Sequence, residues 1–469
     1  MFKYFKFVIV SFLCLFVQAV FSQNAFNSML DMDSTYRYNT SLKVLDSLIS
    51  TGEGTKDTSF YSSYGRAEVI SLDQMIYFAL NNNQDLKAVW YNIDADVLMR
   101  KEKSVLPDPM FAFELDNVNS DLKKVGMINF FASQTFPFPG KLDIEKQSAV
   151  KSRDMMVQEH HNMETELIND VKMKYYDLYL VNRKIDINKD NQLLISNFIS
   201  ASQSRYAVGK GMQQEVFKSQ IELSKLLNEQ VVLEQDRKSI LSDLTKFTRV
   251  VIDENTKVNF SSIDEDYLLD KDNFKLENVN VDRLVDYAFQ NRADLKAVKN
   301  KIILNQTELE KSRLSRMPDL SLQLGYRILP FEEKNAFEFM IGVNVPIAPW
   351  SSGKYDYSIQ RSTVNIKSAT DEYEALRTQI RGEIKSTVSS LLSAKETMGY
   401  YHSVVIPQTE NSLKSTQSSY ENNLTTFLDL LDSYRMYQDA RLMYYDSMNM
   451  YLKMIAGLEK VTGMNFKNQ

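Results

Sequence analysis

Few residues in this sequence have the types and spacing that chemistry requires. Asp429 and Asp432 stand three positions apart, so on a helix both carboxylates lie on one face, where they can attract a cation. The alternative is a solvated helix face, the usual place of acidic side chains. The sequence Gly209-Lys210-Gly211 lacks the spacing of a phosphate-binding loop.

The three histidines are His160, His161 and His402. His160 and Glu164 are four residues apart and could share a metal ion, but with no third ligand recognised close in sequence a packing or surface role is favoured. The single cysteine, Cys14, lies in the first segment of the chain. We therefore predict no metal site, no cofactor and no enzymatic activity.

The first residues predict export. Lys3 and Lys6 precede an apolar run over residues 7–20, and small residues follow before Gln23, which predicts a cleaved signal peptide over residues 1–22. The alternative is an N-terminal membrane anchor, for which the apolar run is short. Loss of the two lysines leaves 53 basic against 61 acidic residues, a net charge of −8. Such a balance argues against a nucleic-acid partner.

The chain repeats itself. Residues 71–89 and 280–298 match at eight of nineteen positions, including a shared Asp-Leu-Lys-Ala-Val, and Pro-Asp and Gly-Lys pairs recur in the same order afterwards. We interpret this as an internal duplication, with a first repeat over 71–279 and a second over 280–463. An N-terminal extension over 23–70, an acidic connector over 251–279 and a tail over 464–469 complete the chain.

Long helices are predicted in both repeats. Residues 141–208 contain no Gly or Pro, and apolar residues recur there at spacings of three and four, as they do in the second repeat over 354–421. At 1.5 Å per residue the first helix would be a rod of about 100 Å. The stripe of apolar side chains along so long a helix needs a partner helix in the same hairpin, and further subunits, to cover it.

Between the helices, apolar and polar residues alternate over about 109–138 and about 319–347, which predicts two strand pairs. Strict alternation is required of a membrane barrel, and the alternative is a half-buried hairpin in a soluble domain. Two hairpins at equivalent places favour the barrel. Four strands cannot close one in lipid, so an oligomer follows. The residues predicted to face lipid are Leu320, Leu322, Leu324, Tyr326, Phe337, Phe339, Ile341 and Val343.

In this order the motifs resemble the TolC family of outer-membrane efflux proteins. The residues that carry the resemblance are Ala79-Leu80 with Asp85-Leu86, the Pro-Asp and Gly-Lys pairs, Tyr206-Ala207-Val208-Gly209, and Leu458-Glu459 with Gly463. The resemblance implies a mixed α and β fold, in which three chains close a twelve-stranded transmembrane β-barrel that long helical hairpins continue as a periplasmic α-barrel. Phe138-Pro139-Gly140-Lys141 further resembles the branch that serves heavy-metal and RND-type pumps.

The resemblance also implies site residues. A pore constriction would be formed by Asp429, Asp432, Glu215 and Tyr420, with Thr425 standing where the family has its gating arginine. The turns that would dock an adaptor contain Val208, Gly209, Lys210, Gly211, Asn422, Asn423 and Leu424.

The function that follows is a passive trimeric duct in the outer membrane of a Gram-negative bacterium. It would export small molecules or metal cations delivered by a periplasmic adaptor, a membrane fusion protein, and an inner-membrane RND-type pump. The alternative is a secreted or periplasmic coiled-coil adaptor or scaffold without a pore, which should carry one hairpin and a compact β domain.

Overall fold

The computed structural model describes residues 69–118, 125–263, 268, 280–329, 334–346, 350 and 352–464, and residues 67–469 form one compact unit. The expected signal peptide, nearly all of the N-terminal extension, most of the tail and residues 264–267 and 269–279 of the connector lie outside the described residues.

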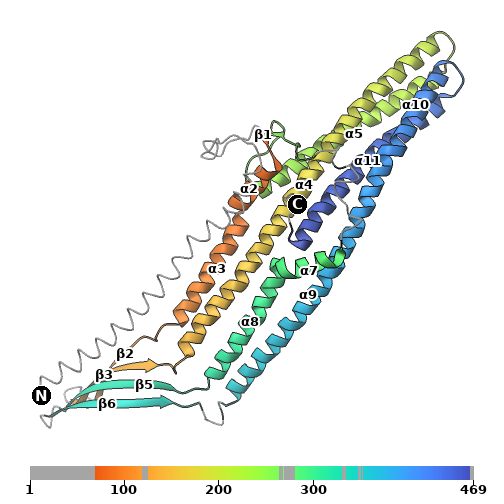
Figure 1. The fold of residues 1–469 in the computed structure, drawn as a ribbon. Coiled ribbons are helices and arrows are strands. Elements are labelled where there is room, and N and C mark those ends of the chain that lie inside the picture. The colour runs from red at the N-terminus through yellow and green to blue at the C-terminus, as the bar shows by residue number, and fades with distance from the viewer. Residues whose placement is uncertain are drawn as a thin grey trace. The chain divides into compact units, whose positions relative to one another are not determined.

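Both halves of the described chain follow the same order of elements (Figure 1). The first half contains α2 (Leu72–Asn82), α3 (Gln84–Lys103), β2 (Met110–Val118), β3 (Val125–Phe136), α4 (Lys141–Ala207) and α5 (Gln213–Thr248). The second contains α7 (Val281–Asn291), α8 (Ala293–Leu314), β5 (Asp319–Leu329), β6 (Lys334–Asn344), α9 (Ser352–Tyr400), η3 (Tyr401–Val405), α10 (Ile406–Glu421) and α11 (Phe427–Thr462). The strand bounds agree with those predicted from alternation.

Each half opens with two helices where the sequence predicted one. Asn83 has an extended backbone and its side chain accepts hydrogen bonds from the amides of Asp85 and Leu86, so that α2 ends and α3 is capped at one residue. Arg292 separates α7 from α8 at the equivalent position. The break went unpredicted because residues 71–89 and 280–298 contain no Gly or Pro that would mark the end of a helix.

The first long helix is uninterrupted, whereas the second is not. Helix α4 runs for 67 residues, but the predicted helix over 354–421 is divided by the five-residue π-helical segment η3 before α10. Pro407 lies in the first turn of α10. Because proline lacks an N–H and its ring collides with the carbonyl four residues earlier, a wider turn accommodates it there.

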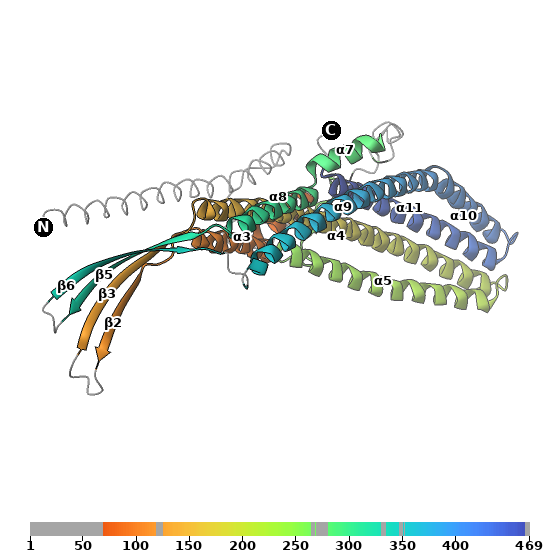
Figure 2. The same ribbon diagram turned by 90° about the horizontal axis from the view of Figure 1, so that it is seen from below.

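The long helices pack side by side (Figures 1 and 2). Helix α4 contacts α3 and α8 near the strands and α5 further on, while α9 and α10 pack against α11. Val171, Tyr175 and Leu178, which are among the apolar residues spaced by three and four on α4, are at most 1% exposed and belong to the larger apolar core. A second core near the far turns is formed by Ile195, Phe198, Leu226, Leu413, Tyr420, Phe427, Leu430, Leu431 and Tyr434.

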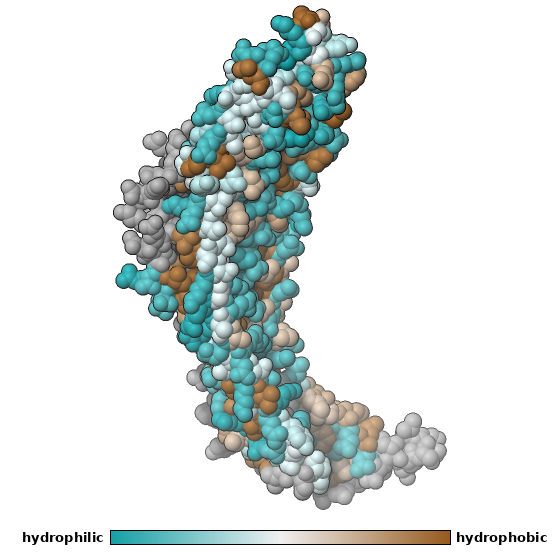
Figure 3. Space-filling model, turned by 90° about the vertical axis from the view of Figure 1, so that its right-hand side faces the viewer, coloured by the Kyte–Doolittle hydropathy of each residue, from teal (hydrophilic) through white to brown (hydrophobic). Residues whose placement is uncertain are grey.

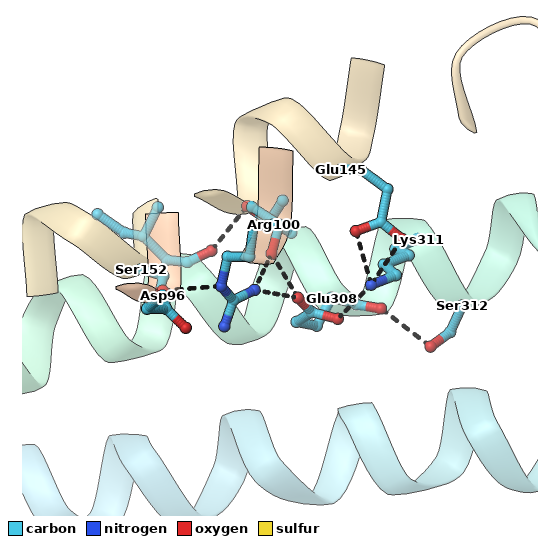
Figure 4. A network of polar contacts seen from close by, with 10 residues as sticks. Asp96, Arg100, Glu145, Ser152, Glu308, Lys311 and Ser312 are labelled. Atoms are coloured by element: carbon cyan, nitrogen blue, oxygen red, sulfur yellow. Dashed lines mark hydrogen bonds and ion pairs between the residues drawn. The ribbon is translucent and has the colours of Figure 1, made fainter. Parts of the chain in front are cut away.

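A polar layer joins α3, α4 and α8 close to the strands (Figure 4). Arg100 donates to Asp96 at 3.0 Å and to Glu308 at 3.3 Å, and Ser152 donates to the same Asp96 oxygen at 2.7 Å. Lys311 lies 2.8 Å from Glu145 on α4. Every charged group of this layer has an opposite charge beside it, which offsets the cost of removing it from water.

The strands form one antiparallel sheet in the order β2-β3-β5-β6, and the four lie beside one another in Figure 2. The connection between the halves is β3 against β5, where Phe130 pairs with Tyr326 and Ala132 with Leu324. A further two-residue parallel pair, β1 (Val69–Ile70) with β4 (Lys257–Val258), was not predicted.

In the part of the chain that the structure describes, no helix carries an apolar stretch long enough to cross a bilayer.

Candidate functional site

The two turns at the far end of the long helices share one backbone geometry. In the first, Gly209 has a φ of 71°, and the amide of Lys210 donates to the carbonyl of Arg205 at 2.8 Å. In the second, Asn423 has a φ of 63°, and the amide of Leu424 donates to the carbonyl of Ser419, also at 2.8 Å. Both are therefore helix ends closed by a left-handed residue, which Gly and Asn tolerate best.

The predicted docking turns are solvent-exposed. Val208 is 68% exposed and Leu424 is 80% exposed, and hydrophobic colour is visible at this end of the molecule in Figure 3. Gly211 fits closely in the first turn, because a Cβ at that position would lie 3.0 Å from the Cβ of Arg205 and would require the neighbouring atoms to shift slightly. These two apolar side chains are exposed on tightly closed turns and belong to neither of the two larger apolar cores.

Tyr420 and Glu215, which the resemblance placed in the constriction, are in contact. Tyr420 is 2% exposed, and its hydroxyl donates to Glu215 Oε2 at 2.7 Å. Burial, above all, raises the pKa of Tyr420, and the neighbouring Glu215 carboxylate acts in the same direction. The hydroxyl therefore stays protonated and donates across the two hairpins at neutral pH.

Arg205 holds Tyr420 from the first turn. Its Nη1 donates to the carbonyl of Tyr420, and its guanidinium carbon lies 4.1 Å from the centre of the Tyr420 ring. Its other terminal nitrogen donates to the carbonyl of Lys210 at 3.4 Å. One cation thus connects both turns, through a charged hydrogen bond and a cation–π contact.

Asp429 has a structural role that the sequence did not predict. Its Oδ2 accepts from the hydroxyl of Thr425 at 2.8 Å and from the amide and hydroxyl of Thr426 at 3.0 and 2.6 Å. Together with Thr426 it forms the capping box of α11. The Thr426 hydroxyl, followed by that of Thr425, lowers the pKa of Asp429. Thr425, which the resemblance placed where the family has its gating arginine, therefore donates to a residue of the helix cap.

Asp432 lies one turn further along α11 and is exposed, as Asp429 is. Next to it, Arg435 reaches across to α5 and its Nη2 lies 3.0 Å from Glu222 Oε2. Burial opposes ionisation of Glu222, but hydrogen bonds from Arg435 and Lys225 outweigh it and lower the pKa of this carboxyl. The two hairpins are consequently joined by an ion pair as well as by the Tyr420 contact.

Sequence reasoning missed Arg205, Glu222 and Arg435. Arg205 and Tyr420 are 215 residues apart in the chain, and Arg435 and Glu222 are 213 apart. No local spacing links members of such pairs. The only signal was the matching of the two turns, which places Arg205 one residue before Tyr206 and Ser419 one residue before Tyr420.

At the other end of the helices, the residues predicted to face lipid share one face of the sheet. The register pairs Leu320 with Val343, Leu322 with Ile341, Leu324 with Phe339 and Tyr326 with Phe337. Phe337, Phe339, Ile341 and Val343 are each more than half exposed. Register partners point to the same side of a sheet, so the face is continuous, and Phe113 on β2 extends it through its contact with Phe130.

The opposite face of the sheet is polar. Asn129 donates to Glu114 at 3.1 Å and accepts from Arg327 at 3.3 Å, and Arg327 forms an ion pair with Glu338. Asn129 is only 4% exposed, and its two hydrogen bonds satisfy both ends of its buried side-chain amide. The sheet thus has an exposed apolar face and a hydrogen-bonded polar face, which is the reverse of a soluble domain with its apolar face covered.

No protein-family model and no curated protein matches this sequence. Solved structures do match. CusC, whose crystal structures concern folding and transmembrane channel formation, matches with a TM-score of 0.70 at 11% identity over 84% of this chain and 92% of that chain. The outer membrane channel CmeC of Campylobacter jejuni matches with a TM-score of 0.68 at 14% identity over 84% and 85%.

The open state of the MtrE outer membrane channel of Neisseria gonorrhoeae matches with a TM-score of 0.66 at 13% identity, over 84% of this chain and 88% of that chain. The chain therefore has the fold of these TolC-type channels. The resemblance to the TolC family that the motifs indicated is confirmed at the level of the fold.

Proposed function

We propose that this chain is one protomer of a trimeric duct in the outer membrane, a passive and non-enzymatic export channel. The observation that carries the proposal is the four-stranded sheet, which exposes a continuous apolar face and turns a polar face the other way. An apolar surface of this kind is stable against lipid, and a polar one against a wet lumen. The fold shared with CusC, CmeC and MtrE supports the same interpretation.

The sheet edges argue for three chains. Strands β2 and β6 lie at the ends of the strand order, and neither has a further partner among the described residues. Unpaired backbone groups cost several kcal/mol each in hydrocarbon, so the edges must meet other strands. Pairing β6 of one copy with β2 of the next, three times, closes twelve strands in one ring and leaves the long helices to continue as a tunnel.

The far turns would then be the periplasmic end. Their exposed Val208 and Leu424 offer apolar contacts to the hairpin tip of a periplasmic adaptor, through which an RND-type inner-membrane pump would deliver cargo. Asp429 and Asp432 of three copies would form two rings of carboxylates, which attract cations. Glu215, Tyr420 and Arg205 would hold the two hairpins of each protomer in register at that constriction.

An adaptor or scaffold without a pore is the alternative. It would not need a sheet with a large exposed apolar face, because such a surface promotes aggregation in water. The exposed apolar face of the sheet therefore distinguishes a membrane channel from an adaptor or scaffold.

Leu322→Arg and Gln323→Arg test the proposal directly. The two residues are neighbours on β5 and lie on opposite faces of the sheet. Arginine at Leu322 should cost about 2–4 kcal/mol per chain if it enters lipid, and little at Gln323 if that position faces water. We expect Leu322→Arg to lose the trimer seen by unheated electrophoresis of the outer-membrane fraction, and Gln323→Arg to keep it. Equal behaviour of the two variants, or a soluble monomer for the unmodified chain, would contradict the proposal.

A further inference from the structure

A cluster of metal-ligand side chains lies on α4, away from the turns and the sheet. It consists of His160, His161 and Glu164, whose donor atoms are all within 4.8 Å of one another. Glu164 is placed between the two rings: Oε1 is 3.6 Å from His160 Nδ1, and Oε2 is 2.8 Å from His161 Nδ1. Because one helix supplies all three side chains, the cluster does not depend on assembly of the trimer.

The His160 ring is fixed by packing. It is 9% exposed and packs edge-on against Trp90 of α3, with ring centroids 5.3 Å apart. Its Nδ1 is buried and has no hydrogen-bond partner among the described residues. The same nitrogen is the one that lies 3.6 Å from Glu164 Oε1, so it is available to an ion held between the two residues.

We infer that His160 Nδ1, His161 Nδ1 and Glu164 bind one divalent transition-metal ion of the class that includes Zn²⁺, Ni²⁺ and Cu²⁺. Two imidazole nitrogens and one carboxylate suit these ions, whereas Mg²⁺ and Ca²⁺ require oxygen ligands. In a tetrahedral site with bonds of about 2.0–2.1 Å, donor atoms lie about 3.3 Å apart. His160 Nδ1 is 3.6 Å from Glu164 Oε1 and His161 Nδ1 is 2.8 Å from Glu164 Oε2, on either side of that value, and one donor atom from each of the three residues lies within 4.8 Å of the other two.

The outer side of the cluster is open to an ion. The side chain of His161 is 52% exposed and that of Glu164 is 28% exposed, whereas His160 forms the buried wall. Because the His161 side chain is half exposed, it has room to turn toward an ion, and the open side leaves space for water to complete the coordination.

Visible absorption during titration with Co²⁺ tests the inference, using the purified full chain in detergent without a histidine tag. We expect one Co²⁺ per chain, with bands far stronger than those of hydrated Co²⁺ and lost when one equivalent of Zn²⁺ is added. Glu164→Gln and His161→Asn should each weaken binding by roughly 100-fold or more, since each removes a direct ligand and loss of an outer partner alone costs about 10–100-fold.

His402→Ala is the matched control, because His402 lies on η3 against Tyr444 and is not part of the cluster. It should bind Co²⁺ as the unmodified chain does. His160→Ala should abolish binding, and because that side chain is buried, its trimer content is checked in the same preparation. The inference is overturned if no strong bands form, if Glu164→Gln and His161→Asn bind normally, or if His402→Ala weakens binding as much as they do. The readout is binding alone, so it stands whether or not the chain conducts ions.

Discussion

At the first hairpin tip the chain turns through Val208, Gly209, Lys210, Gly211 and Met212, whereas at the second it turns through Asn422, Asn423, Leu424, Thr425 and Thr426. The backbones close in the same way, and each following helix has an acidic residue at its third position, Glu215 or Asp429. The residue before the helix differs. Thr426 caps α11 and engages Asp429, while Met212 has no side chain that can cap α5.

This difference decides what the two carboxylates do. Asp429 is held by its own turn, through three hydrogen bonds. Glu215 is not used in a cap, so its side chain reaches the other hairpin and accepts a hydrogen bond from the hydroxyl of Tyr420. One tip is thus stabilised locally and the other contributes the contacts between hairpins, to which Arg205 also belongs.

The largest effect is expected from Arg205→Ala, because Arg205 contacts both turns. Its charged hydrogen bond contributes about 1.5–3 kcal/mol and its cation–π contact about 0.5–2 kcal/mol, so we expect the free energy of local opening at the second turn to fall by about 2–5 kcal/mol. Hydrogen exchange of the Leu424 amide measures it. Lys210→Ala, an exposed cation in the same turn, should leave that exchange unchanged. Equal exchange in both variants would show that Arg205 does not join the tips.

A smaller effect is expected from Tyr420→Phe, which removes the donor to Glu215. A hydrogen bond to a charged group contributes about 1.5–3 kcal/mol, and a double-mutant cycle with Glu215→Gln isolates the coupling between the two residues. Tyr206→Phe is the matched control, since Tyr206 holds the equivalent place in the first turn but is 50% exposed. Additive effects of Tyr420→Phe and Glu215→Gln would mean that the contact does not couple the hairpins.

The smallest effect separates the two caps. Thr426→Ala should lower the stability of the first turn of α11 by about 1 kcal/mol, whereas Met212→Ala should leave the stability of the first turn of α5 almost unchanged. Hydrogen exchange of the first amides of each helix measures both effects. Because the cap lowers the pKa of Asp429, its stabilisation is present above the ordinary aspartate pKa of about 3.9 and is lost as the pH falls through the lowered value. If Thr426→Ala and Met212→Ala change the stability of their helices equally, the two hairpin tips are not capped differently.

The sequence predicted the elements whose pattern is local. The strand pairs were predicted within a few residues because alternation of period two defines a strand and its apolar face together. The long α4 was predicted because it contains no breaker over 67 residues. The π-helical segment η3 was not, since the effect of Pro407 depends on how the surrounding helices hold the chain on either side of it.

Of the candidate site, the sequence and the family resemblance identified Tyr420 and Glu215, and the structure brings them together. They did not identify Arg205 or the Arg435–Glu222 pair, because each joins segments more than 200 residues apart. Nor did they find the third member of the α4 cluster. Neighbouring residues on a helix point about 100° apart, so His161 was not counted beside His160, yet Glu164 lies between them.

The most direct test of the proposed duct is conductance of the purified trimer in a planar bilayer. The account predicts a cation-favouring current that a trivalent cation, added on the side of the long helices, blocks. Asp432→Asn should weaken this block severalfold, because it removes three exposed carboxylates near the turns, whereas Asp286→Asn on α7 should not. Absence of any conductance from membrane-inserted trimers would contradict the duct itself. A current blocked equally well after Asp432→Asn would place the constriction elsewhere.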